Sequence, residues 1–151
     1  MRKSSLLSMS VASLAAVILT AGIARAEGME TLALVEHAAS DAVTDTGAEG
    51  DSAGDLLTFA NEIFDKDNAT KLGTDSGWCI RVAPGQSWEC FWTLTLVDGQ
   101  ITVEGPFLDV GDSVLAVTGG TGKYAGARGE MALHARNDKG TEYDFNYKLT
   151  Y

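Results

Sequence analysis

Eight short segments rich in β-branched and aromatic residues restrict the fold of this chain more than any other feature. They are expected at residues 31–37, 56–64, 77–82, 88–97, 101–107, 114–118, 130–136 and 142–151, separated by turns of glycine, aspartate and asparagine. No window has a convincing helical period, and most connections are too short for crossover helices, so the segments indicate an antiparallel meander. Because closure removes exposed sheet edges, the sequence predicts an all-β fold, a small closed eight-stranded antiparallel β-barrel.

The connections differ in length. Most are short turns such as Asp98-Gly99, but residues 38–54 form a long stretch of alanine, aspartate, glycine, serine and threonine. We expect this stretch to be a mobile loop, which either gates the mouth of a cavity or is a plain flexible linker.

The first 26 residues have the pattern of a secretory signal peptide. Arg2 and Lys3 precede an uncharged apolar stretch at 9–23, and Ala24-Arg25-Ala26 offers the small residues that signal peptidase requires. The apolar stretch is short for a bilayer span, and no second one follows. We therefore expect an exported protein, secreted or periplasmic, with one domain at residues 27–151 that is not attached to a membrane after cleavage.

The charge of the chain excludes some partners. The full chain has 21 acidic and 11 basic residues, a net charge of −10, and three of the basic residues lie in the predicted signal peptide. Because an acidic surface repels phosphate groups, nucleic acids and anionic membranes are disfavoured as partners. Acidity does not say what the protein binds instead.

The two cysteines flank a turn at Pro84-Gly85. If the turn is centred there, Cys79 and Cys90 lie directly opposite each other on neighbouring strands. Opposed Cα atoms in such a pair are about 4.5 to 5.5 Å apart, within the range of a disulfide, and an oxidising compartment permits the bond. The alternative is two buried free thiols.

Alternation of side chains along each segment assigns the inner face of the barrel. One face carries Trp88, Cys90 and Trp92, and the turn register adds Cys79 and Arg81. Residues 57, 59, 61 and 63 share the corresponding face of an earlier segment. Such an interior suits a largely apolar ligand, although a filled core without a cavity satisfies the same pattern. If Arg81 points inward, it could pair with Glu36 or bind a substrate carboxylate; we expect instead that it points outward as an ordinary surface charge.

Motifs for metals and cofactors are incomplete. Asp65, Asp67 and Asp75 resemble a calcium loop but lack its glycine and its final glutamate, and the histidines and cysteines lack zinc spacing. The glycine-rich segment 120–125 is not followed by a helix that could bind a pyrophosphate. We expect neither a metal nor a cofactor.

Four motifs together resemble the allene oxide cyclase family. They are Gly54-Asp-Leu-Leu-Thr-Phe-Ala-Asn61, Gly77-Trp-Cys79, Val103-Glu-Gly-Pro-Phe107 and Asp112-Ser-Val-Leu-Ala-Val-Thr-Gly-Gly-Thr-Gly-Lys-Tyr-Ala-Gly-Ala-Arg-Gly129. The last is also similar to dirigent proteins, which share the eight-stranded barrel. The resemblance covers nearly the whole chain from residue 31. It implies a cofactor-independent isomerase that opens an unstable fatty-acid epoxide and closes it to one cyclopentenone enantiomer.

The resemblance also implies site residues. Glu36 would be the carboxylate on the first strand, and Asn61 the amide that helps to hold a water near the epoxide oxygen. Phe59, Cys79 and Trp88 fall on the cavity lining, to which the inner-face pattern adds Trp92. A desolvated carboxylate can stabilise developing cationic character, and rigid aromatic walls can fix one substrate conformer.

Some positions depart from the plant cyclases. Phe107, which we also expect to contact the substrate, stands where they carry a tyrosine, and Ala38 where they carry an asparagine. The Ser-Pro pair that holds their water has no clear counterpart in residues 38–54. Glu36 can also be interpreted as a carboxylate on the rim, and Asn61 as an amide bonded to the backbone.

Three functions are consistent with the sequence. The chain is an exported cyclase or isomerase for a small apolar substrate, a dirigent-like protein that only controls stereochemistry, or a lipocalin-like binder of a hydrophobic small molecule. Barrels of this family associate as trimers or dimers, so we expect a homo-oligomer. The outward Trp78, Ile80 and Phe91 are the candidate contacts.

Overall fold

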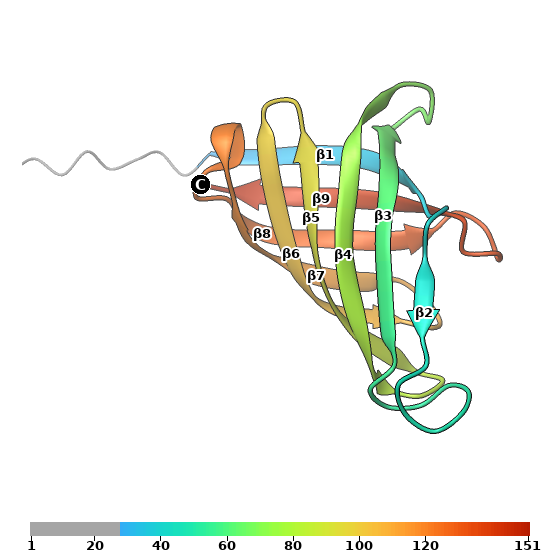
Figure 1. Ribbon diagram of the computed structural model, residues 1–151. Coiled ribbons are helices and arrows are strands. Elements are labelled where there is room, and N and C mark those ends of the chain that lie inside the picture. The colour runs from blue at the N-terminus through green and yellow to red at the C-terminus, as the bar shows by residue number, and fades with distance from the viewer. Residues whose placement is uncertain (1–27) are drawn as a thin grey trace, which may run out of the picture.

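Nine β-strands and one short 3-10 helix make up the computed structural model, which describes residues 28–151 (Figure 1). The elements are β1 (Met29–His37), β2 (Ala42–Thr44), β3 (Leu56–Asp65), β4 (Lys71–Ala83), β5 (Ser87–Leu96), β6 (Gly99–Leu108), β7 (Ser113–Gly120), η1 (Gly122–Tyr124), β8 (Arg128–Ala135) and β9 (Glu142–Thr150). The predicted signal peptide lies outside the described residues. Within 28–151, no helix is long and apolar enough to cross a membrane.

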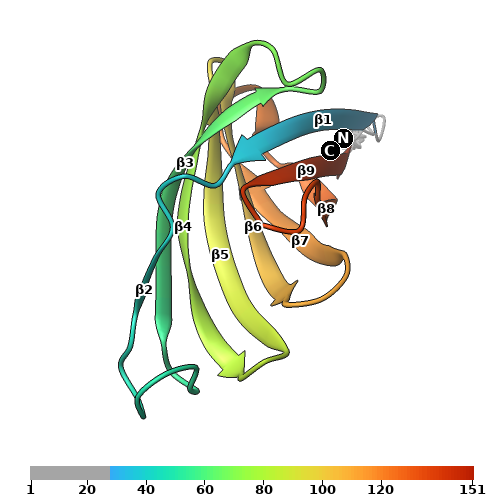
Figure 2. The ribbon, with the colours of Figure 1, turned by 90° about the vertical axis from the view of Figure 1, so that its right-hand side faces the viewer.

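Eight of the strands close into the predicted antiparallel barrel. Neighbours along the sheet follow the order β1-β9-β8-β7-β6-β5-β4-β3-β2, and a further pairing between β1 and β3 completes the ring. This closure is short, because only Leu34 to His37 of β1 pair with Glu62 to Asp65 of β3. Figure 2 shows the end of β1 reaching β3 while the other strands curve around the interior. The predicted fold class is confirmed.

The ninth strand lies within the segment predicted to be a mobile loop. Strand β2 pairs with Leu56 to Thr58 of β3, beyond the part of β3 that β1 covers. The chain therefore leaves the edge of β3 at residues 38–41 and returns to it at Ala42. This strand was not predicted, because three residues are too few to show a period in the sequence, whereas the free edge of β3 offers hydrogen bonds to them.

Strand β4 begins six residues before the predicted segment 77–82. Its first half is polar, but it is paired on both sides, with β3 and with β5. At Gly77 the strands are so close that a side chain would collide with the carbonyl oxygen of Phe91 and the backbone of Trp92. Tertiary pairing therefore extends a strand that propensity alone would end, and this brings Asp75 onto the inner face.

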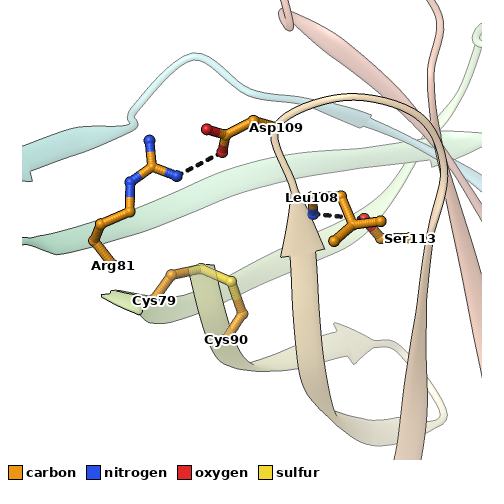
Figure 3. Close-up of a disulfide and its surroundings, with 6 residues drawn as sticks. All are labelled: Cys79, Arg81, Cys90, Leu108, Asp109 and Ser113. Atoms are coloured by element: carbon orange, nitrogen blue, oxygen red, sulfur yellow. Dashed lines mark hydrogen bonds and ion pairs between the residues drawn. A yellow bond between two sulfur atoms is a disulfide. The ribbon is translucent and has the colours of Figure 1, made fainter. Parts of the chain in front are cut away.

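The β4–β5 hairpin has the predicted register. Cys79 is opposite Cys90, and Arg81 is opposite Trp88. The cysteines form a disulfide with their Cα atoms 4.0 Å apart (Figure 3). On the outer face of the same hairpin, Trp78 is 43% exposed. One face of the hairpin thus lines the interior, and the other exposes the apolar side chains of Trp78, Ile80 and Val82.

Candidate active site

A narrow cavity with aromatic walls enters the barrel. It has a volume of about 40 Å³ and is lined by Glu36, Asp41, Leu57, Phe59, Cys79, Cys90, Trp92, Phe107, Leu133, Tyr143 and Phe145. A wider hollow of about 350 Å³ lies between the β6–β7 and β8–β9 connections and shares Phe107, Leu133 and Tyr143 with it. We call these spaces the inner cavity and the vestibule. Because the three shared side chains line both spaces, the inner cavity and the vestibule adjoin each other.

The aromatic side chains of the inner cavity support one another. Trp92 stacks on Phe145 with ring centroids 5.7 Å apart and meets Phe59 edge-on at 5.9 Å. Phe107 meets Tyr143 edge-on at 5.9 Å at the side shared with the vestibule. Offset and edge-on pairs of this kind are favourable contacts that restrict ring motion. The walls of the inner cavity are therefore apolar, and their rings hold one another in place.

Glu36 is the buried carboxyl group of the inner cavity. It is the second-last residue of β1, points inward and is only 5% exposed. Its Oε1 accepts a hydrogen bond of 2.8 Å from Asn61 Nδ2. Burial raises the pKa of Glu36 to about 7, against the opposing effect of the Asn61 hydrogen bond, so both protonation states are populated near neutral pH. The structure therefore places Glu36 inside the barrel, not on its rim.

Asn61 on β3 links the end of β1 to the connection between β1 and β2 by hydrogen bonds. Its Nδ2 donates to Glu36 and, at 2.8 Å, to Asp41 Oδ1. Its Oδ1 accepts from the backbone N–H groups of Ala39 and Ser40 and from the Ser40 hydroxyl, at 3.2, 3.0 and 2.8 Å. Both amide hydrogens are thus donated to carboxylates of the protein, so the side chain orients Glu36.

Asp75 is a buried carboxyl group of the site that was not predicted from the sequence. It lies opposite Asn61 on β4 and is 1% exposed, and no donor among the described residues reaches either carboxyl oxygen. Burial and the neighbouring Glu36 raise the pKa of Asp75 to about 9, so it is protonated at neutral pH. Extending the predicted strand from Gly77 towards the N-terminus puts Asp75 on the same face as Gly77, Cys79 and Arg81, because every second residue of a strand points the same way.

The structure brings most of the predicted site residues together. Phe59, Cys79, Trp92 and Phe107 line the inner cavity with Glu36, and Asn61 lies directly behind them. Trp88 does not line this cavity. Its ring packs under the Arg81 guanidinium, 4.3 Å from the ring centroid, beside a separate hollow next to β2.

Arg81 is a buried cation, contrary to the expectation of a surface charge. Its guanidinium pairs with Asp51 at 2.5 Å and with Asp109 at 2.6 Å, and its side chain is 9% exposed. Figure 3 shows the pair with Asp109. Asp51 comes from the segment before β3 and Asp109 from the β6–β7 connection. These partners are distant in sequence, so their meeting at this end of the barrel could not be read from local patterns. Two carboxylates thus occupy the Arg81 guanidinium.

Within residues 28–151, no cluster of histidine, cysteine, aspartate and glutamate has the arrangement of a metal site. The donors at the inner cavity are carboxyl and amide groups already bonded to one another. Carboxyl and amide groups in such a position can transfer protons and stabilise charge.

Fold and site together define a class of protein, a closed eight-stranded antiparallel barrel with a buried carboxyl group at the inner end of an aromatic cavity. The profile described as allene oxide cyclase matches residues 34–138, and the chain belongs to that family.

Solved structures with the same fold differ in what they are described to do. One described as pyocyanin demethylase is 27% identical with a TM-score of 0.68, over 80% of this chain and 99% of that one. An exo-specific intermolecular Diels-Alderase is 15% identical with a TM-score of 0.66, over 82% and 99% of the two chains. A pterocarpan synthase dirigent protein is 13% identical with a TM-score of 0.66, over 82% and 94%. The last two likenesses show the shared fold alone.

Proposed function

We propose that this protein is a cofactor-independent cyclase or isomerase that holds a small, largely apolar, reactive substrate in the inner cavity and directs its closure to one stereoisomer. One observation carries the proposal: the Glu36 carboxyl is buried at an aromatic-lined cavity and held in place by Asn61. Burying an ionisable group destabilises the fold, so the presence of Glu36 at this position favours a functional role. Membership of the allene oxide cyclase family supports the same reaction class.

Glu36 has two roles in the proposed reaction. In its acid form it gives a proton to the oxygen of a strained substrate group, such as an epoxide, as the carbon–oxygen bond opens. The resulting carboxylate faces the carbon skeleton, where it stabilises positive charge and takes a proton back after ring closure. No atom is gained or lost overall, so the reaction is an isomerisation. A pKa of about 7 suits a group that must both give and accept a proton near neutral pH.

The charges around the site define the end of the substrate that enters. The inner cavity exposes Glu36 and Asp41 to a ligand. The buried cation Arg81 is already paired with two carboxylates, and Arg136 in the vestibule lies 3.4 Å from Asp144. An anionic group would therefore meet repulsion without a free partner inside. We infer that the entering end of the substrate is uncharged or cationic.

The test is chiral analysis of the product formed from a freshly generated allene oxide, with and without the protein. We expect faster closure and an excess of one enantiomer, both lost in Glu36→Gln and retained in Glu104→Gln, whose carboxyl group faces outward on β6. Racemic product at an unchanged rate would exclude this substrate. Pyocyanin is a second compound to test for consumption, given the similarity to a pyocyanin demethylase.

The same measurements separate the other two functions. A changed product ratio without faster consumption would indicate stereocontrol without catalysis, as expected of a dirigent-like protein. Quenching of Trp92 fluorescence by apolar compounds without product would indicate a carrier, since Trp92 lines the inner cavity and Trp88 does not.

A further inference from the structure

The buried carboxyl group of Asp75 has no partner that could donate a hydrogen bond to it. Both of its oxygens are buried, and no donor among residues 28–151 reaches either of them. The hydroxyl of Tyr147, a neighbour of Asp75, and the indole nitrogen of Trp92, which lies beside Tyr147, are buried and have no hydrogen-bond partner among residues 28–151 either. An ionised carboxylate in such surroundings would cost far more than a native fold tolerates, so Asp75 must carry a proton.

A protonated carboxyl group is a donor and requires an acceptor. The acceptor within reach is the Glu36 carboxyl, which is buried on the same inner face. The backbone fixes this arrangement: Asp75 is the cross-strand partner of Asn61, and Asn61 holds Glu36 by a 2.8 Å hydrogen bond. Three side chains on three strands thus lie next to one another, and a hydrogen bond from Asp75 to Glu36 would join them into a chain.

We propose that Asp75 is a positioning residue for Glu36: it retains its proton and donates it in a hydrogen bond to the Glu36 carboxylate, so that the two groups act as a dyad. The proposal rests on the proposed function of Glu36, whose working form Asp75 would set. Glu36 faces the cavity, whereas Asp75 does not line it, so the exchangeable proton is the one on Glu36.

Other titratable groups also change the pKa of Glu36, but none of them replaces Asp75 as a donor to it. Asp41, after β1, raises the pKa of Glu36 through its negative charge, and His37 on β1 lowers it. On β9, Tyr143 and Tyr147 have raised pKa values and stay neutral near pH 7. Removing the donor at position 75 should therefore raise the pKa of Glu36, because its carboxylate loses a charge-assisted hydrogen bond in a buried site.

Infrared spectroscopy of the whole protein tests the dyad without any substrate. At about pH 8, above the pKa of Glu36, we expect the carbonyl stretch of one protonated buried carboxyl group in the native protein. The band should be absent in Asp75→Asn and present in Asp98→Asn, which changes an exposed aspartate in the β5–β6 turn. Absence of the band in the native protein, or its persistence in Asp75→Asn, would overturn the proposal.

A titration of Glu36 by infrared spectroscopy distinguishes a positioning role of Asp75 from a purely structural one, because only a positioning role changes the pKa of Glu36. Asp75→Leu should raise its midpoint by about one to two pH units, the equivalent of one hydrogen bond to a charged group. Asp75→Asn keeps an N–H donor of the same shape and should restore a midpoint near that of the native protein. An unchanged midpoint in Asp75→Leu refutes the dyad. Because neither spectrum depends on turnover, a failed cyclase assay would leave this result standing.

Discussion

Replacing Glu36 with glutamine should stabilise the protein at alkaline pH. Burial raises the pKa of Glu36 from 4.5 to about 7. The folded protein therefore binds this proton more tightly than the unfolded chain does. Below about pH 4.5 both states hold the proton, and as pH rises towards 7 only the unfolded state gives it up, so the free energy of unfolding decreases over that window and then levels off.

The size of the effect follows from the shift in pKa. At about 1.4 kcal/mol per pH unit, the shift corresponds to a loss of about 3 kcal/mol of folding stability above pH 7. Glutamine stays neutral over the whole range, and its Oε1 can still accept the hydrogen bond from Asn61. We therefore expect Glu36→Gln to match the native protein near pH 4.5 and to exceed it by up to about 3 kcal/mol near pH 8.

Urea unfolding followed by tryptophan fluorescence, repeated from acid to alkaline pH, measures this difference. Glu104→Gln is the matched control, because its carboxyl group is exposed on the outer face of β6 and its curve should parallel that of the native protein. If the Glu36→Gln curve also runs parallel to the native one, Glu36 does not titrate with a raised pKa and the argument for its burial fails. A protein that becomes more stable on losing a buried carboxyl group retains that group for function rather than for folding.

Further substitutions test the surroundings of the site. Replacing both Cys79 and Cys90 with serine should lower the free energy of unfolding by about 3 kcal/mol, the loop-closure entropy of their 11-residue separation, as measured by urea unfolding. Asn61→Ala should cost at least about 2 kcal/mol and raise the pKa of Glu36 further, since the buried carboxylate loses its donor; an unchanged infrared titration would contradict this. Arg81→Met should speed hydrogen exchange of the segment before β3, because Asp51 loses its cation, and unchanged exchange there would show that the ion pair does not hold that segment. We expect a dimer or trimer in sedimentation that dissociates in Trp78→Ser; a native monomer would exclude this contact.

The parts of the site that the sequence predicted were those governed by alternation along a single strand. Phe59, Asn61 and Trp92 lie on the inner face because every second residue of a strand points the same way. The pairing of Cys79 with Cys90 follows from counting outward from one short turn. Such inferences need only local geometry, which nearby residues specify.

The parts that could not be predicted depend on pairing between distant segments. Asp75 lies in a polar stretch that resembles a loop and becomes strand only because β3 and β5 pair with it on both sides. Arg81 was expected at the surface because neither Asp51 nor Asp109 is near it in sequence. Strand β2 forms on the part of the β3 edge that β1 leaves uncovered, and that part is known only once the pairing of β1 with β3 is known.

Taken by itself, then, the order of residues determined the all-β class, the inward set of side chains and the family to which the chain belongs, because periodicity and turn chemistry act over a few residues. The tertiary structure decided which carboxyl groups face each other. Glu36 and Asp75 are 39 positions apart, and only the meeting of β1, β3 and β4 removes them from water and brings them together. Desolvation and the proximity of a second carboxyl group alter the protonation of these side chains, and both are properties of the closed barrel rather than of any segment in it.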